Sequence, residues 1–214
     1  MKITVGTFNL NNLFSRYNFK GQINAIKNNE TTVASTLEYT FGPQDEYRIR
    51  QYKGKLVKPK DDKKKKKVVD RIIAMDVDVL AVQEVEDIDT LKAFNRDSLN
   101  KMYPYVTLIE GNDPRLIDVG LLSKYPVGAA TSWQHAVHKD SPARPIFGRD
   151  LLETQILSRN RKKILFTLFN NHLKSHFCSY RQDQAACTKK NNKRRKRQSD
   201  MIAQIVKKQT RPTS

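Results

Sequence analysis

The sequence of 214 residues contains no long apolar run and very little cysteine. No uninterrupted apolar stretch approaches the roughly 18 residues that a helix needs to cross a bilayer. The apolar run after Lys2 meets Asn9, and it is too short for the core of a signal peptide. These absences predict a cytoplasmic protein.

Cysteine occurs only as Cys178 and Cys187, which lie in one polar segment. A disulfide between them is kept as an alternative, but two free thiols are the expected state of a chain without an export signal. No CxxC pair or zinc-type set of cysteine and histidine accompanies them, so a zinc site is not expected.

Negative charge is scarce, because 22 Asp and Glu stand against 40 Lys and Arg, which gives a formal net charge of +18. The excess lies in residues 48–73, with 12 Lys/Arg and 3 Asp/Glu, and in residues 174–211, with 12 Lys/Arg and 2 Asp/Glu. Segregated positive charge favours a polyanionic partner, since each neutralised phosphate releases condensed counterions. Solvated lysine runs that maintain solubility are the alternative, and composition alone does not choose between them.

Apolar periodicity predicts an α/β protein. Short alternating or continuously apolar segments predict strands at residues 2–8, 77–82, 105–109, 119–123, 151–157 and 164–169. Helical spacing predicts helices from Lys63 to Met75, after a cap at Asp87 or Asp89, and from Asn192 to Lys208. We expect one domain over residues 1–214, with an irregular basic insertion at residues 15–62 and a basic loop at 178–197 that leads into the last helix.

Polar side chains follow several of the predicted strands. Asn9 follows the first strand, Glu84 the buried central strand, and Asn170 and His172 the last one. Sites of α/β sheets are usually built at strand ends. One carboxylate with amide oxygens suits Mg²⁺, and a histidine near the metal suits phosphoryl chemistry. Each residue alone has an ordinary alternative, such as a solvated glutamate, a turn asparagine or a structural histidine.

Taken together, these residues resemble motifs of the endonuclease/exonuclease/phosphatase superfamily, which includes deoxyribonuclease I, abasic-site endonucleases, sphingomyelinases and inositol-polyphosphate phosphatases. The three motifs are Thr7-Phe8-Asn9-Leu10, Leu80-Ala81-Val82-Gln83-Glu84-Val85 and Asn170-Asn171-His172-Leu173-Lys174-Ser175. The segment 118–126 is similar to the family's mid-sheet pattern, and Phe147-Gly148-Arg149-Asp150 resembles its arginine-bearing turn. The resemblance implies a two-sheet α/β sandwich of the deoxyribonuclease I-like type.

The resemblance also implies a metal and its ligands. Glu84 matches the metal-binding glutamate, and Asn9 matches the asparagine beside the metal. The implied ion is Mg²⁺, with Mn²⁺ as the alternative. His172 matches a histidine that flanks the scissile phosphate, and Asn170 and Asn9 are expected to share the catalytic site with it.

Substrate contacts are implied for three further residues. Arg149 matches a phosphate-contacting arginine, Lys174 stands where a basic residue would face the substrate, and Asp118 begins the mid-sheet pattern. The implied activity is metal-dependent hydrolysis of nucleic acid phosphodiester bonds. Apart from Tyr47, Tyr52 and Tyr180, aromatic residues are not interleaved with the lysines, so we expect sequence-nonspecific contacts to the backbone.

Two motifs of the family, Gly-Asp-Phe-Asn and Ser-Asp-His, are missing from this sequence. They would supply an aspartate–asparagine pair at the phosphate and an aspartate–histidine pair that activates water. We therefore expect a C-terminally incomplete domain, with part of the second sheet missing and with reduced activity, since general-base help is worth roughly 10²–10⁴-fold. Two alternatives stay open: a phospholipid or inositol-phosphate phosphoesterase of the same fold, and a catalytically incomplete fragment that only binds nucleic acid.

Overall fold

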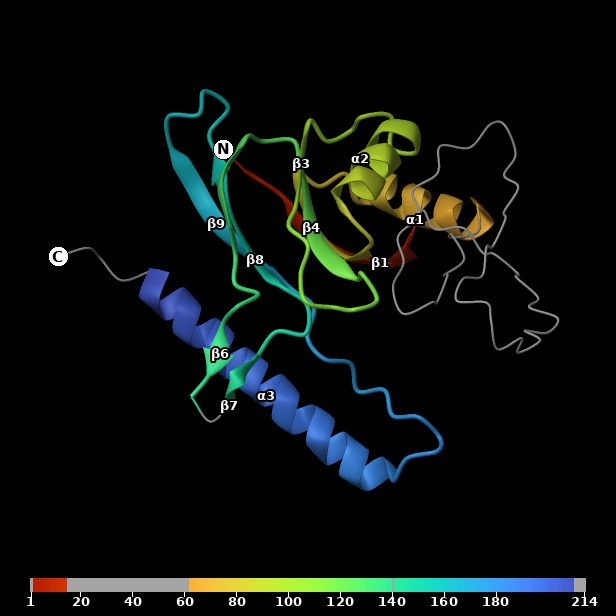
Figure 1. Ribbon diagram of the computed structural model, residues 1–214. Coiled ribbons are helices and arrows are strands. Elements are labelled where there is room, and N and C mark those ends of the chain that lie inside the picture. Colours follow the sequence, from red (N-terminus) through yellow and green to blue (C-terminus); the bar gives the residue numbers. More distant parts are fainter. Residues whose placement is uncertain (1, 15–61, 140, 210–214) are drawn as a thin grey trace, which may run out of the picture.

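The computed structural model describes residues 2–14, 62–139 and 141–209 (Figure 1). Residues 15–61 of the predicted insertion lie outside this part. The elements in chain order are β1 (Val5–Leu13), α1 (Asp62–Met75), β2 (Val79–Val85), α2 (Ile88–Asp97), β3 (Tyr105–Leu108), β4 (Asp118–Ser123), β5 (Val127–Ser132), β6 (Val137–His138), β7 (Ser141–Pro145), β8 (Leu151–Leu157), β9 (Ile164–Asn171) and α3 (Gln184–Gln209). The predicted α/β class is confirmed.

The strands of the described ranges form two larger sheets and a short hairpin. In the first sheet the order is β1-β2-β4-β3, with β1 parallel to β2 and the other pairs antiparallel. The second sheet, β5-β8-β9, is antiparallel, and β6 pairs with β7. The sequence pattern did not predict β5, β6 or β7, because their residues are mostly exposed and show no apolar alternation.

Helices α1 and α2 cover one face of the first sheet (Figure 1). The main core cluster joins Val68 and Ile72 of α1 to Leu91 and Phe94 of α2, together with apolar residues of the first sheet. Asp87 caps α2, since its side chain accepts a hydrogen bond from the Thr90 N–H at 2.7 Å. The sequence predicted a cap at Asp87 or Asp89, and the structure places it at Asp87.

The other face of the first sheet packs on the second sheet. Val79 of β2 and Leu121 of β4 form a core cluster with Ile156 of β8, and Leu168 of β9 packs against it. Every residue of β2 except Glu84 is buried, as the continuous apolar sequence predicted for a strand covered on both faces. A deoxyribonuclease I-like sandwich remains a prediction.

Helix α3 packs against the second sheet through its C-terminal half. Met201, Ile202 and Ile205 belong to a third cluster that also contains Phe147 and Phe169. The N-terminal half of α3 extends beyond the two sheets (Figure 1). The helix begins at Gln184, earlier than the predicted Asn192, because its first turns are polar and carry no apolar stripe that would mark them as helical. None of the helices in the described ranges combines the length and apolar character that a membrane span requires.

Cys178 and Cys187 form a disulfide, so the predicted free thiols are wrong. Their separation in sequence is 9 residues, and the early start of α3 brings Cys187 back toward Cys178. The buried side chain of Asn191 donates to the Phe177 carbonyl oxygen at 3.2 Å and lies 3.5 Å from both sulfur atoms. The segment before α3 is therefore fastened to the helix by a covalent bond and a hydrogen bond.

Candidate active site

Glu84 projects from an irregularity in the central strand. The pairing of β2 shifts register on both of its sides near this residue. Glu84 has φ 62°, in the left-handed region that is unfavourable for a residue with a long side chain. Its Oε2 accepts a hydrogen bond from the Asn12 backbone N–H at 3.0 Å. The strained backbone turns the carboxylate out of the strand ladder toward the end of β9.

His172 follows β9 and faces this carboxylate. Its Nε2 lies 3.7 Å from Glu84 Oε1, and each side chain is 19% exposed. Burial lowers the pKa of His172 below its ordinary value, and the charge of Arg149 lowers it further, against the opposing effect of Glu84. The imidazole is therefore mainly neutral at pH 7. Nδ1 is buried without a hydrogen-bond partner among the described residues, which leaves Nε2 as the nitrogen that faces the site.

Arg149 is buried directly behind His172. Its Nη1 donates to the carbonyl oxygens of His172 at 3.4 Å and Leu173 at 3.2 Å. Its Nε lies 3.2 Å from Asp113 Oδ2, and Asp113 also accepts two hydrogen bonds from the guanidinium of Arg115, at 3.1 and 2.9 Å. Burial raises the pKa of Asp113, but Arg115 and Arg149 outweigh burial and hold it below the ordinary value. One carboxylate thus holds two guanidinium groups beside His172.

These groups line a cavity of about 390 Å³ that is rich in positive charge, which we call the cationic cavity. Arg115, Arg149, Lys174 and Arg194 line it together with His172. Burial lowers the pKa of Lys174, and the neighbouring arginines add to the effect. Four cationic side chains around one cavity, with Asp113 as the one carboxylate in its lining, favour an anionic ligand such as a phosphate-bearing molecule.

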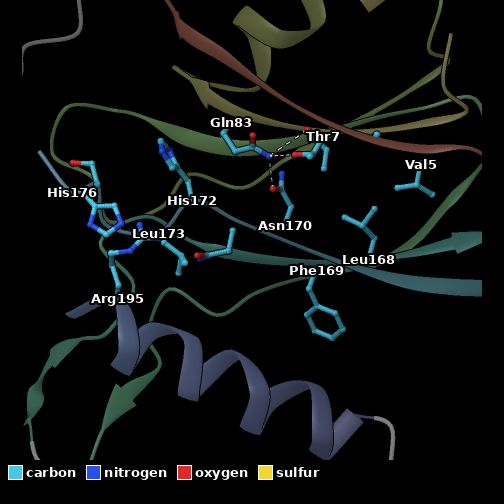
Figure 2. Close-up of a pocket in the computed structure, with 14 residues that line it drawn as sticks. Val5, Thr7, Gln83, Leu168, Phe169, Asn170, His172, Leu173, His176 and Arg195 are labelled. Atoms are coloured by element: carbon cyan, nitrogen blue, oxygen red, sulfur yellow. Dashed lines mark hydrogen bonds between the residues drawn. The ribbon is translucent and has the colours of Figure 1, made fainter. Parts of the chain in front are cut away.

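A second, larger cavity of about 720 Å³ is also lined by His172 (Figure 2). It lies between β1 and β9, which are edge strands of the two sheets. Figure 2 shows His172 at one end of it, beside His176 and Arg195, and the polar group of Thr7, Gln83 and Asn170 farther along. His172 and Ser175 line both cavities, so the segment after β9 separates them.

Asn170 joins the two sheets. Its Nδ2 donates to the carbonyl oxygens of Val82 at 2.9 Å and Gly120 at 2.8 Å, and its Oδ1 accepts from Gln83 Nε2 at 2.8 Å. The side chain is buried, and these bonds use both of its donor hydrogens. The predicted catalytic residue therefore has a structural position in the protein, where it fixes β9 and the following His172 against the first sheet.

Asn9 and Asp118 are not brought into the same cluster as Glu84 and His172. Asn9 is exposed, and its Oδ1 accepts from the Asn11 backbone N–H at 2.7 Å in a local turn. Asp118 is 1% exposed, accepts from the Gly111 N–H at 2.8 Å and lines neither cavity. The substrate contact predicted for Asp118 does not fit this placement, because its side chain points into the protein at the start of β4.

The donor set fits a magnesium ion only in part. Glu84 offers a carboxylate with Oε1 directed toward His172, which suits an ion that takes few protein ligands and keeps its waters. Asn9, the second predicted ligand, has its amide oxygen engaged in the local turn. In the part of the chain that the structure describes, no group of three or more His, Cys, Asp or Glu side chains converges on a possible metal position.

Three charged residues of the cationic cavity were not predicted as site residues from the sequence, namely Asp113, Arg115 and Arg194. Asp113 and Arg115 flank a proline just before β4, and this turn chemistry was a signal that could have marked the loop. Arg194 is one of several basic residues in its run, so its position at the cavity depends on the packing of α3. A side chain at Gly148 would stand 2.8 Å from Arg194 Nη2, so this glycine leaves room for the arginine.

Comparison of the chain with protein-family models, curated proteins and solved structures found no match. The superfamily resemblance is therefore carried by the motifs of the sequence alone.

Proposed function

We propose that this protein is a metal-dependent phosphodiesterase that acts on nucleic acid, with its site at Glu84 and His172. The observation that carries the proposal is the approach of these side chains to 3.7 Å next to the cationic cavity. The two residues come from the ends of strands in different sheets. Such convergence of a carboxylate, a histidine and several cations suits the binding of a phosphodiester.

In this proposal the side chains of the site have separate roles. Lys174 and the arginines of the cationic cavity hold the non-bridging oxygens of the phosphate. His172 presents Nε2 to the same space, and its lowered pKa leaves it mainly neutral at pH 7, so that it can hydrogen-bond an oxygen or exchange a proton with it. Mg²⁺ or Mn²⁺ held by Glu84 would neutralise charge that develops on the phosphate.

The partner in this proposal is nucleic acid bound through its backbone, and the positive charge of α3 and the cationic cavity supports it. The predicted cytoplasmic location is retained only as a prediction. The Cys178–Cys187 disulfide weighs against it, because disulfides persist mainly in oxidising compartments.

The proposal is tested by incubating the full chain with supercoiled plasmid, single-stranded RNA or an inositol polyphosphate, in Mg²⁺ or in EDTA. We expect Mg²⁺-dependent cutting of nucleic acid that Glu84→Gln and His172→Ala both abolish. Asp70→Asn is the control, because Asp70 is exposed on α1 and pairs with Lys66 at 3.1 Å, away from the site.

Two outcomes would contradict the proposal. Release of inorganic phosphate from the inositol polyphosphate without nucleic acid cutting would assign the site to the phosphoesterase alternative. Salt-sensitive retention of the plasmid on a gel without any cutting would identify a protein that only binds nucleic acid.

A further inference from the structure

Two aromatic side chains of the segment between β9 and α3 are exposed to solvent. Phe177 is 76% exposed and Tyr180 is 84% exposed, more than any other large apolar side chain in the described ranges. Aromatic rings contribute most to stability and binding when they are covered, so a pair that the fold leaves in water indicates a surface for a ligand.

Phe177 is also part of the cationic cavity. It lines the same space as Lys174, Arg115 and Arg194. A nucleotide presents a charged phosphate and a flat base a few ångströms apart. A cavity with cationic walls and an aromatic ring at its edge can receive both parts, because every base has a face that stacks on an aromatic ring.

We propose that Phe177 and Tyr180 form a stacking surface for unpaired bases of a nucleic acid whose backbone enters the cationic cavity. This inference rests on the proposed function and names its substrate class as single-stranded. The bases of a duplex are already stacked on each other, so only a strand with free bases gains from the two rings. The surface adds base stacking to the backbone contacts that the sequence predicted.

The backbone at Phe177 is held in place in the absence of a ligand. Its carbonyl oxygen accepts a hydrogen bond from Asn191 of α3 at 3.2 Å, and the next residue, Cys178, is linked to α3 through the disulfide. A ring on a fastened segment loses less conformational freedom on binding than a ring on a free loop.

Tyr180 carries a cation on one side of its ring. The Arg181 guanidinium lies 5.4 Å from the ring centroid, and its Nε donates to the tyrosine hydroxyl oxygen at 3.0 Å. The arginine supports the ring and adds a charge that can contact a neighbouring phosphate. The opposite face of the ring is the one that would stack on a base.

A row of basic side chains on α3 extends the surface beyond a single nucleotide. Lys190, Arg194 and Arg197 lie at i, i+4 and i+7, so they share one side of the helix. Arg194 of this set lines the cationic cavity. A membrane-binding segment would combine such charge with several aliphatic side chains. Here the residues next to the two rings in the sequence are polar or small, which favours a nucleic acid strand over a lipid surface.

The test measures binding without cleavage. Fluorescence anisotropy in EDTA compares a labelled 12-residue oligo-dT strand, an abasic strand with the same number of phosphates, and a duplex of equal length. We expect the full chain to bind oligo-dT roughly 5- to 150-fold more tightly than the abasic strand for each base that stacks. Phe177→Ala and Tyr180→Ala should each reduce this ratio, because each variant loses more affinity for oligo-dT than for the abasic strand.

The matched control is Ile164→Ala, which removes another exposed apolar side chain (56% exposed) at the start of β9 and should change neither affinity. Equal binding of oligo-dT and the abasic strand by the wild type would overturn the stacking surface and leave the proposed function standing. Absence of binding to every strand would contradict the proposed function itself. Sedimentation with phosphatidylserine vesicles that is lost in Phe177→Ala would assign the rings to lipid and would also overturn the inference.

Discussion

Asn170 and Asp118 are buried polar side chains whose hydrogen bonding differs. The amide hydrogens of Asn170 both reach carbonyl oxygens, whereas Asp118 Oδ2 is buried without a hydrogen-bond partner in the described residues. A buried polar group stabilises a fold only when it is satisfied, and an unsatisfied one is costly. The two residues should therefore respond in opposite directions to substitution.

Asn170→Ala should destabilise the protein by about 2–4 kcal/mol, because it leaves two carbonyl oxygens and the amide of Gln83 with fewer partners. Urea unfolding followed by circular dichroism measures the change. The control Thr167→Ala, at an exposed position of the same strand, should cost less than about 0.5 kcal/mol. Equal midpoints for the Asn170 variant and the wild type would show that this bridge between the sheets does not stabilise them.

Burial raises the pKa of Asp118 to about 7, and this shift predicts a pH dependence of stability. The folded state binds the proton more tightly than the unfolded state, whose pKa is near 3.8. The stabilising contribution is therefore complete below pH 4 and is lost as the pH rises to about 7.

Asp118→Asn should flatten this dependence and stabilise the protein at pH 8, by at most about 4 kcal/mol, because the amide carries no charge to bury. Urea midpoints measured at pH 4, 6 and 8 for both proteins test the prediction. A wild-type slope that the variant reproduces would mean that Asp118 is not the group responsible.

At the scale of elements, the site depends on the backbone conformation at the ends of β2 and β9. Sequence motifs predicted Glu84 and His172, because the residue types and their places after strands were visible. The left-handed backbone of Glu84, which turns its carboxylate toward His172, was not predictable, because it follows from pairing irregularities on both sides of β2. The same limit applies to Arg194, whose place at the cationic cavity is set by the packing of a helix against Ile146 and Phe147.

The Cys178–Cys187 disulfide is a second stabilising feature at the scale of elements. Replacing both Cys178 and Cys187 by serine should lower the free energy of unfolding by about 2–3 kcal/mol, the chain-entropy value for a loop of this length. Hydrogen exchange should increase first in residues 176–190, where the crosslink fastens the segment to α3. Thermal unfolding with and without reductant measures the loss in the wild type. A melting temperature that neither reductant nor the substitutions change would contradict a stabilising role.

At the scale of the whole molecule, sequence patterning predicted the class and most of the core strands and helices, and it missed the exposed strands β5, β6 and β7. The reason is physical: burial imposes a period on a sequence, whereas an exposed strand owes its structure to the backbone of its partner. The predicted role of residues 15–61 concerns a part of the chain outside the described ranges.

The net charge of the whole molecule is expected to affect its affinity for nucleic acid. If the basic segments neutralise about 4–6 phosphates, log affinity for nucleic acid should fall against log salt with a slope of about −4 to −5. Charge reversal at Lys190 and Arg197 should reduce that slope by about 1 for each phosphate that the variant no longer neutralises. Filter binding in EDTA at several salt concentrations measures it. A slope near zero would mean that the lysine runs are only solvated faces.

The central claim is that Glu84 and His172 form one phosphodiesterase site, and a double-mutant cycle on cleavage tests it most directly. Initial rates of cutting of supercoiled plasmid and of single-stranded RNA in Mg²⁺ are compared for the wild type, Glu84→Gln, His172→Ala and the double variant. We predict that each single change lowers the rate by about 10²-fold or more, and that the double variant is no slower than the worse single variant. A wild type without Mg²⁺-dependent cutting of either substrate, or single variants that cut at the wild-type rate, would contradict the account.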